Sequence, residues 1–198
     1  MNKQKIDKIM KKLKKSSIGI AGLGGLGSNA AIALARAGVG KLVLVDFDKV
    51  EKSNLNRQYF FINQIGKKKT EAIAENITKI NPDIKIELLN SKLKKGEMER
   101  PFKKVDLIIE ALDNAETKKT FIEEILTKLP EKPIIGASGV AGYGASDRIK
   151  TIKSGKLYIC YDEKAKSSNE DILTAPKVCL MANWQANIAL EILLEENK

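Results

Sequence analysis

A glycine-rich stretch with regular spacing, Gly22-Leu-Gly-Gly-Leu-Gly27, is the part of the sequence that most directly predicts a chemical role. It follows a short apolar segment and precedes a run rich in Ala and Leu, the strand–turn–helix setting in which G-x-G-x-x-G binds phosphate. Gly22 allows a tight turn, and Gly27 lets the helix and the strand pack closely. Gly24, with Gly25 beside it, lets the backbone approach a phosphate, which the free N–H groups at the helix start would also face.

Two carboxylates follow the next apolar segment of the sequence. Asp46 closes that segment 24 residues after Gly22, at the position where a carboxylate can accept hydrogen bonds from ribose hydroxyls. Asp48 lies two residues further on and is assigned to the same binding site. The glycines and these carboxylates predict a bound nucleotide, but they do not separate NAD from ATP.

Polar side chains continue beyond Asp48 through a stretch that is too long and irregular for an ordinary strand–helix link. Asn54, Arg57 and Lys69 follow one another there. Because Arg can grip phosphate oxygens with two parallel hydrogen bonds and Lys supplies a point charge, this group suits a triphosphate whose bonds are broken. Taken singly, Arg57 could form a surface salt bridge and Lys69 could be a solvated helix residue.

A second pair of polar residues, Asp113 and Asn114, lies just past a later apolar segment, at the sheet edge where ligands of α/β proteins bind. A carboxylate at this position could hold Mg²⁺ against phosphates. Asp113 is therefore the predicted metal-binding residue, and Asn114 is assigned to the nucleotide site. The simpler alternative for Asp113 is a helix N-cap.

The elements that must position these residues alternate between strand and helix patterns. We predict an α/β, Rossmann-like fold: a mostly parallel sheet flanked by helices, with a β-hairpin and a final helix at its C-terminal end, in a single domain over 1–198. Predicted strands cover Ser17–Ala21, Leu42–Val45, Ile84–Leu89, Val105–Ile109 and Pro133–Ala137, and the hairpin pairs Arg148–Ile152 with Lys156–Tyr161 about Ser154-Gly155. Predicted helices cover about Leu26–Ala37, Lys68–Ile80, 115–128 and Val178–Leu194, and residues 162–176 are expected to be polar and mobile.

The net charge of +10 is concentrated at the start of the chain, because residues 1–15 hold seven Lys and one acid, Asp7. Apolar residues recur among them at helical spacing: Ile6, Ile9, Met10 and Leu13. This spacing predicts a Lys-rich helix whose apolar face packs inward, although such a basic face can also bind nucleic acid or an acidic protein. No apolar run approaches the roughly 20 residues of a membrane span, so we expect a soluble cytoplasmic protein without a membrane partner.

The two cysteines, Cys160 and Cys179, lack the spacing of a metal or redox motif. They are therefore expected to be reduced thiols. Cys179 lies in the apolar start of the final helix, which favours a buried thiol. Cys160 lies at the end of a strand and is expected to be the more exposed of the two.

At these residues the sequence resembles the ThiF/MoeB/HesA family, the bacterial relatives of ubiquitin-activating enzymes. The resemblance rests on GIAGLGGLGSN at 19–29, DFDKVEKSNLNRQ at 46–58, GKKK at 66–69 and ALDNAETK at 111–118. It continues through 136–151 and 175–194 and so covers nearly the whole chain. SNLNRQ is far more specific than the glycines, and the short length is most similar to the short ThiF-like family 2 proteins of thiamine biosynthesis.

The resemblance implies an adenylyltransferase that uses ATP and Mg²⁺ and acts as a homodimer. The terminal glycine carboxylate of a ubiquitin-like, ThiS-like sulfur carrier would attack the α-phosphate of ATP, and the acyl-adenylate would serve thiazole formation in thiamine biosynthesis. By resemblance, the glycines cradle the nucleotide, Asp46 holds the ribose and Asp113 serves Mg²⁺. The residues implied to contact the phosphates are Asn54, Arg57 and Lys69. The predicted catalytic residues are Arg57, Lys69 and Asp113.

The sequence also departs from its relatives. Many relatives hold structural zinc with two Cys-x-x-Cys pairs, which are missing here together with any His, so we predict no zinc site. No cysteine lies in the stretch 169–175 where larger relatives place a reactive one, and no Arg precedes Arg36, whereas dimeric relatives supply an N-terminal arginine to the partner's ATP. The alternatives left open are an ATP-dependent dehydratase of threonylcarbamoyladenosine in tRNA, a non-catalytic nucleotide-binding module and an NAD-dependent oxidoreductase.

Overall fold

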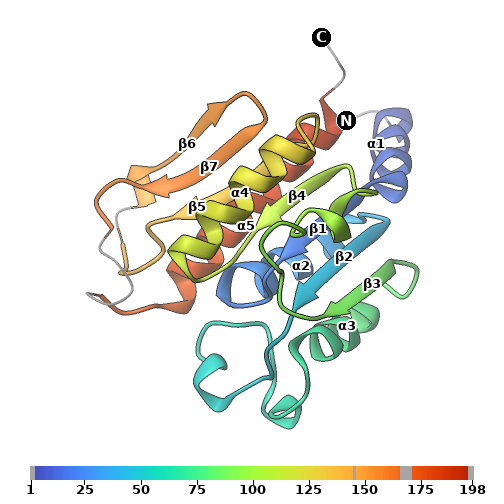
Figure 1. The fold of residues 1–198 in the computed structure, drawn as a ribbon. Helices are drawn as coiled ribbons and strands as arrows, with labels where there is room; N and C mark the ends of the chain where they lie inside the picture. The colour runs from blue at the N-terminus through green and yellow to red at the C-terminus, as the bar shows by residue number, and fades with distance from the viewer. Residues whose placement is uncertain (1–2, 145, 166–170, 196–198) are drawn as a thin grey trace.

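Seven strands form one sheet in the computed structural model, which describes residues 3–144, 146–165 and 171–195 (Figure 1). Their order is β3-β2-β1-β4-β5-β7-β6, and neighbours are parallel except for β6, which pairs antiparallel with β7. The strands are β1 (Ser17–Ala21), β2 (Lys41–Asp46), β3 (Lys85–Asn90), β4 (Leu107–Glu110), β5 (Ile134–Ser138), β6 (Ile149–Ser154) and β7 (Leu157–Asp162). This arrangement confirms the predicted α/β, Rossmann-like class.

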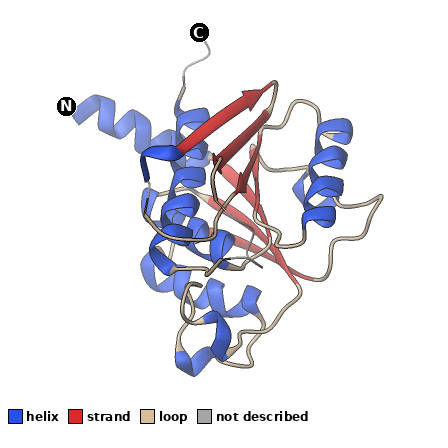
Figure 2. Cartoon of the chain, turned by 90° about the vertical axis from the view of Figure 1, so that its left-hand side faces the viewer, coloured by secondary structure: helices blue, strands red, loops and turns tan. Residues whose placement is uncertain are grey.

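Helices cover both faces of the sheet (Figure 2). On one face lies α4 (Ala115–Lys128), and on the other lie α2 (Gly25–Ala37), α3 (Lys69–Ile80) and α5 (Ala175–Leu194). The helix α1 (Lys3–Lys15) packs beside α5. Short 3₁₀ helices lie in the connections: η1 (Lys52–Asn54), η2 (Ile62–Gln64), η3 (Arg100–Phe102) and η4 (Ser146–Arg148).

Alternate residues of the central strands enter two separate cores. In β2, Leu42 and Leu44 pack with α2, α3 and α5, whereas Val43 and Val45 pack with α4 and η3. Because successive side chains of a strand point to opposite faces, a strand that is covered on both faces is an unbroken apolar run in the sequence. This explains why the central strands are predictable from the sequence.

The order of the strands reverses between β1 and β4, which are neighbours in the sheet although β2 and β3 separate them in the chain. In open α/β sheets, ligands bind in the crevice beyond the carboxyl ends of the strands at such a reversal. Gly22 directly follows β1 and Asp113 follows β4 by three residues. The topology therefore brings the two most separated parts of the predicted site to one edge of the sheet.

Most predicted boundaries shift by one or two residues, and two of the changes have a local explanation. α5 begins at Ala175 instead of Val178, because Pro176 is tolerated in the first turn of a helix. β6 continues to Ser154, so the turn of the hairpin lies one residue later than predicted, at Gly155 and Lys156. Within the predicted mobile stretch 162–176, residues 166–170 lie outside the described residues.

The predicted N-terminal helix forms as α1, but only part of its apolar face packs inward. Leu13 is buried and Ile9 is half-buried against the core, whereas Ile6 and Met10 are 40% and 47% exposed. The inward packing predicted for Ile6 is wrong, because the N-terminal half of α1 extends away from the body (Figure 2). Met10 packs inward only in part, with its terminal methyl beside Gly38. None of the described helices has the length and apolar character to cross a membrane.

Candidate functional site

A cavity of about 770 Å³ opens at the carboxyl edge of the sheet, where the turn after β1 faces the ends of β2, β4 and β5. Most of the predicted site residues meet there. Those that line the cavity are Gly22, Gly24, Gly25, Asp46, Asp48, Arg57, Lys69, Asp113 and Asn114. Gly27 and Asn54 do not line it.

The glycine turn is built as its spacing predicts. Gly22 has a φ of +92°, and a β-carbon there would lie 2.6 Å from the carbonyl oxygen of Ala111, so a side chain would be strained and crowded. Gly27 lies behind the turn, where a β-carbon would overlap the carbonyl oxygen of Gly22. Because α2 begins at Gly25, its free N–H groups and its positive dipole end lie at the cavity.

Asp46, the last residue of β2, ties that strand to the glycine turn. One carboxylate oxygen accepts a hydrogen bond from the Leu23 N–H at 2.6 Å, and the other accepts from the Asp48 N–H at 2.7 Å. Burial raises the pKa of Asp46 and outweighs the opposing effect of these two N–H groups and of Lys69. A carboxylate oxygen has two lone pairs, so Asp46 can still accept from ribose hydroxyls.

Lys69, the first residue of α3, is not a solvated helix residue. Its side chain is only 7% exposed, and its ammonium group lies 2.9 Å from the carboxylate of Asp48. The Lys69 N–H also donates to the Asp48 carbonyl at 2.9 Å, and Lys49 and Lys68 form a short antiparallel bridge. These contacts close the long connection after β2 and hold a buried cation at the cavity wall.

Arg57 lies in the same connection and also lines the cavity. Its guanidinium donates to the Ser53 carbonyl at 2.9 Å and to the side-chain oxygen of Asn56 at 2.8 Å. The Arg57 carbonyl accepts from the side-chain amide of Asn29 in α2, which fixes the connection beside the glycine turn. Within the part of the chain that the structure describes, Arg57 pairs with no carboxylate, so the surface salt bridge does not form and its charge is available to a ligand.

Two asparagines that were predicted to bind the nucleotide have structural roles. Asn54 is buried outside the cavity, and its side-chain oxygen accepts from the Glu51 N–H at 3.1 Å, so its position does not support the predicted phosphate contact. Asn114 lines the cavity but is the N-cap of α4, accepting from the Thr117 N–H at 2.9 Å. The N-cap role is therefore not that of Asp113, which is exposed at the cavity.

A buried ion pair at the inner wall of the cavity was missed by the sequence prediction. Glu110, the last residue of β4, is fully buried, and its carboxylate lies 2.6 Å from the ammonium group of Lys118 in α4. Glu110 also accepts from the Leu112 N–H at 2.7 Å, and Lys118 lines the cavity. Burial raises the pKa of Glu110, with the Lys118 charge acting in the opposite direction. The sequence does contain a signal for this ion pair, because Glu110 is a charged residue at the end of an otherwise apolar strand.

The cavity has further walls on both sides of the glycine turn. On the β3 side, Phe47 follows β2 while Lys92 and Leu93 follow β3, and the Lys92 ammonium lies 5.7 Å from the centre of the Phe47 ring. Toward β5 the wall becomes less polar, and the residues there are Ser138, Gly139, Val140, Ala141, Leu173 and Val178. The side-chain oxygen of Gln58 is buried at the cavity with no hydrogen-bond partner among the described residues.

The two cysteines are buried in the opposite order to the predicted one. Cys160 is fully buried, because β7 is an inner strand between β5 and β6, and burial raises the pKa of its thiol to about 12. Cys179 is half-buried, and burial raises its pKa as well. No three His, Cys, Asp or Glu side chains of the described residues are grouped as a metal site, and the absence of zinc stays a prediction.

Sequence relatives of the chain are ubiquitin-like modifier-activating enzymes. Ubiquitin-like modifier-activating enzyme 5 of Caenorhabditis briggsae is 31% identical over 159 residues, which make up 73% of this chain and 36% of that protein. The enzyme of the same name from Xenopus laevis is 33% identical over 159 residues, 73% of this chain and 39% of that protein. The chain thus spans little more than a third of the length of these curated relatives.

Solved structures share the fold over most of the chain. The E. coli tRNA N6-threonylcarbamoyladenosine dehydratase, TcdA, matches with a TM-score of 0.86 at 20% identity, covering 94% of this chain and 89% of that chain. E. coli MccB, in a structure with ATP, matches with a TM-score of 0.73 at 24% identity, covering 93% of this chain and 57% of that chain. Because the model described as the ThiF family matches residues 3–198, the chain belongs to the ThiF family.

Proposed function

We propose that the chain is an ATP-dependent adenylyltransferase that activates the C-terminal glycine carboxylate of a ubiquitin-like sulfur carrier. The observation that carries this proposal is the meeting of two cations, Arg57 and Lys69, at the cavity that also holds the glycine turn. A reaction that leaves the phosphates intact has little use for these cations, whereas attack at a phosphate is accelerated by fixed positive charge. The relatives named ubiquitin-like modifier-activating enzyme 5 support the same class of reaction.

The cavity offers complementary groups to each part of ATP. The glycine turn and the start of α2 suit the phosphates, and Asp46 at the end of β2 suits the ribose hydroxyls. The less polar wall toward β5 is left for the carrier tail, whose terminal glycines have no side chains to accommodate.

Adenylation at this site requires positioning more than acid–base chemistry. One oxygen of the carrier carboxylate forms a bond to the α-phosphorus of ATP, the bond from that phosphorus to the bridging oxygen breaks, and pyrophosphate leaves with the electron pair. The attacking carboxylate is already an anion and needs no strong base. Arg57 and Lys69 would neutralise the phosphate charge, and the rigid glycine turn would hold the α-phosphate in line.

Asp113 fits the predicted role in holding Mg²⁺. Magnesium bound with a nucleotide keeps several waters and needs only one or two carboxylates besides the phosphates. The Asp113 carboxylate is exposed at the cavity and is not used as the cap of α4. When bound, Mg²⁺ would supply further charge neutralisation at the phosphates.

We also propose a ThiS-like carrier ending in Gly-Gly, a role in forming the thiazole of thiamine, and a homodimer. The motifs of the chain support the carrier. Exposed apolar side chains such as Ile6 and Met10 of α1 and Trp184 of α5 offer contact surface for a second copy. The molar mass in solution, measured by light scattering after gel filtration, tests the dimer separately from the chemistry.

Carrier-dependent exchange of pyrophosphate into ATP tests the proposed reaction. The wild-type protein should exchange only with a carrier that ends in Gly-Gly, and Arg57→Ala or Asp113→Ala should abolish the exchange without unfolding the protein. Arg36→Ala is the control, because Arg36 is exposed at the end of α2 that lies away from the cavity. Normal exchange in either site variant would remove that residue from the mechanism.

ATP binding without exchange would indicate a non-catalytic nucleotide-binding module. Tight binding of NAD would indicate an oxidoreductase.

The second candidate function is the dehydration of threonylcarbamoyladenosine in tRNA. It is favoured by the basic helix α1 and by the likeness to TcdA, which extends over 89% of that chain. Both reactions would use the same ATP cavity, so the acceptor separates them. ATP hydrolysis that depends on tRNA, and is not stimulated by a carrier, would select the dehydratase.

A further inference from the structure

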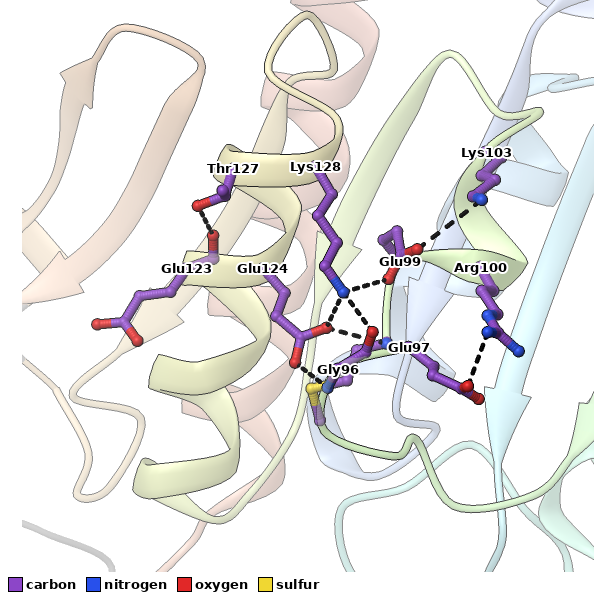
Figure 3. A network of polar contacts seen from close by, with 10 residues as sticks. Gly96, Glu97, Glu99, Arg100, Lys103, Glu123, Glu124, Thr127 and Lys128 are labelled. Carbon is purple, nitrogen blue, oxygen red and sulfur yellow. Dashed lines mark hydrogen bonds and ion pairs between the residues drawn. The ribbon is translucent and has the colours of Figure 1, made fainter.

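A network of charged side chains joins α4 to the connection between β3 and β4 (Figure 3). The Glu124 carboxylate accepts hydrogen bonds from two backbone groups of that connection, the Gly96 N–H and the Met98 N–H. The Lys128 ammonium donates to the Gly96 carbonyl and lies 3.2 Å from both Glu99 and Glu124. We call Glu99, Glu124 and Lys128 the α4 clamp.

The α4 clamp differs from the surface ion pairs around it. The side chains of Glu99 and Glu124 are only 9% and 12% exposed. Burial alone would raise the pKa of Glu124, but the two backbone N–H groups and Lys128 hold it below its usual value. By contrast, Lys119 and Glu123 of the same helix are 3.9 Å apart and mostly exposed, and such pairs contribute little.

The clamp fixes a segment that has no helix or strand of its own. The chain runs from the end of β3 at Asn90 to η3 at Arg100 without regular structure, and Gly96 has a φ of +88°. The clamp holds the middle of this segment, and buried Met98 anchors it in the core beside α4. The first residues of the same segment, from Ser91 to Leu93, form a wall of the cavity.

This wall lies on the β3 side of the cavity. A nucleotide with its phosphates at the glycine turn and its ribose at Asp46 would extend its base toward this side. There the Phe47 ring and the Lys92 and Leu93 side chains line the cavity, with Lys92 held over the ring. Aromatic rings stack well on any nucleobase.

We propose that Glu124 and Lys128 are positioning residues for the nucleobase wall: they order residues 91–98 and so raise affinity for the base of ATP without contacting the nucleotide. The proposal rests on the proposed use of ATP. A wall that is formed for only part of the time lowers the apparent affinity by the formed fraction. The phosphate side, held by α2 and α3, is independent of the clamp.

The test compares ATP with inorganic tripolyphosphate, a probe that has no base, by calorimetric titration. In Lys128→Met the affinity for ATP should fall about fivefold if the wall is formed about a fifth of the time, while the affinity for tripolyphosphate stays within twofold. Lys128→Arg should restore most of the ATP affinity, and Glu124→Gln should behave like Lys128→Met. The matched control is Lys119→Met, which removes an exposed lysine from the same helix and should change neither affinity.

Three results overturn the inference. Unchanged ATP affinity in Lys128→Met would show that the clamp does not act on the site. An equal fall for ATP and tripolyphosphate would show general loosening of the protein instead of an effect on the base. Wild-type protein that binds tripolyphosphate but not ATP would reject the proposed function itself, and the inference with it. Faster amide exchange over residues 94–99 in the variants should accompany the selective loss of ATP affinity.

Discussion

The ammonium group of Lys118 lies 2.6 Å from the carboxylate of Glu110, a side chain with no exposed surface. The same carboxylate accepts from the Leu112 N–H, and the same ammonium donates to the Ala137 carbonyl. One ion pair therefore links the ends of β4 and β5 to the first turns of α4 at the wall of the cavity. It also fixes the turn in which Asp113 lies.

Lys118→Met leaves the buried Glu110 without its cation. Removing one partner of a buried ion pair costs about 3–5 kcal/mol, and we expect about 3 kcal/mol of lost stability near pH 8 because Glu110 can take up a proton instead. Burial already raises the pKa of Glu110 above its usual 4.5, so the folded state binds more protons than the unfolded state as the pH rises above that value. The contribution of Glu110 to the free energy of unfolding therefore falls with rising pH. The loss of stability that Lys118→Met causes, measured by urea unfolding, should be smaller near pH 5 than near pH 8.

The double variant Lys118→Met/Glu110→Gln is the control for this effect. It leaves no buried charge, so most of the stability that Lys118→Met loses near pH 8 should return. An equal loss at both pH values, or no recovery in the double variant, would mean that packing around Lys118 and not the charge of Glu110 determines the stability.

Lys69 and its neighbour Lys68 offer a matched pair of variants for catalysis. Lys69 is buried at the cavity, whereas Lys68 is about half exposed and pairs with Glu71 at the surface. Lys69→Met should lower the rate of carrier-dependent pyrophosphate exchange by about 10²-fold, because it removes a fixed charge from the phosphates. Lys68→Met should change the rate less than twofold. Similar rates in the two variants would argue that Lys69 serves only to pair with Asp48.

The parts of the molecule that the sequence predicts correctly depend on local patterns. The tight turn itself requires Gly22, which has a positive φ, and Gly27, which packs against the Gly22 carbonyl. The inner strands are unbroken apolar runs, and α4 has the boundaries predicted for it, with Asn114 as its cap. The strand reversal at β1 and β4 then brings Asp113 to the glycine turn.

The parts that could not be predicted depend on long-range partners. An asparagine such as Asn54 can bind a phosphate, but its side-chain oxygen can equally accept a hydrogen bond from a nearby backbone N–H. In the structure it accepts from the Glu51 N–H. Phe47 and Lys92 form a wall of the cavity only because β2 and β3 are neighbours, and Lys118 reaches the Ala137 carbonyl only because β4 and β5 are neighbours. How much of α1 is covered depends on how far the body extends beneath it, which no local pattern records (Figure 2).

The thiols should be poor nucleophiles in the folded protein. Burial raises the pKa of Cys160 to about 12, so only about 10⁻⁴ of it is thiolate near pH 8, and the side chain has no exposed surface. Iodoacetamide should therefore label Cys160 only after unfolding, and Cys179 slowly in the folded state. Cys160→Ala and Cys179→Ala should keep carrier-dependent exchange. Rapid labelling of Cys160 in folded protein would contradict its burial.

Asp162 should make the protein sensitive to acid. Its carboxylate lies 2.7 Å from the buried Lys177 ammonium and 3.4 Å from the Arg148 guanidinium. Burial favours a raised pKa, but Lys177, the Lys164 N–H and Arg148 together lower it below the usual 3.8. The stabilisation is therefore complete above the unfolded carboxyl's pKa and is lost as the pH falls through the lower folded value.

Asp162→Asn removes this titration and leaves Lys177 buried without a charged partner. We expect a loss of about 3 kcal/mol in the free energy of unfolding near pH 7, which shrinks toward pH 3 as the wild-type carboxylate becomes protonated. Urea unfolding across this range measures the difference. Glu163→Gln is the matched control, because Glu163 pairs with Lys150 at the exposed edge of the sheet and its loss should cost less than about 1 kcal/mol. A difference between wild type and Asp162→Asn that is constant with pH would show that hydrogen bonding, and not charge, stabilises this cluster.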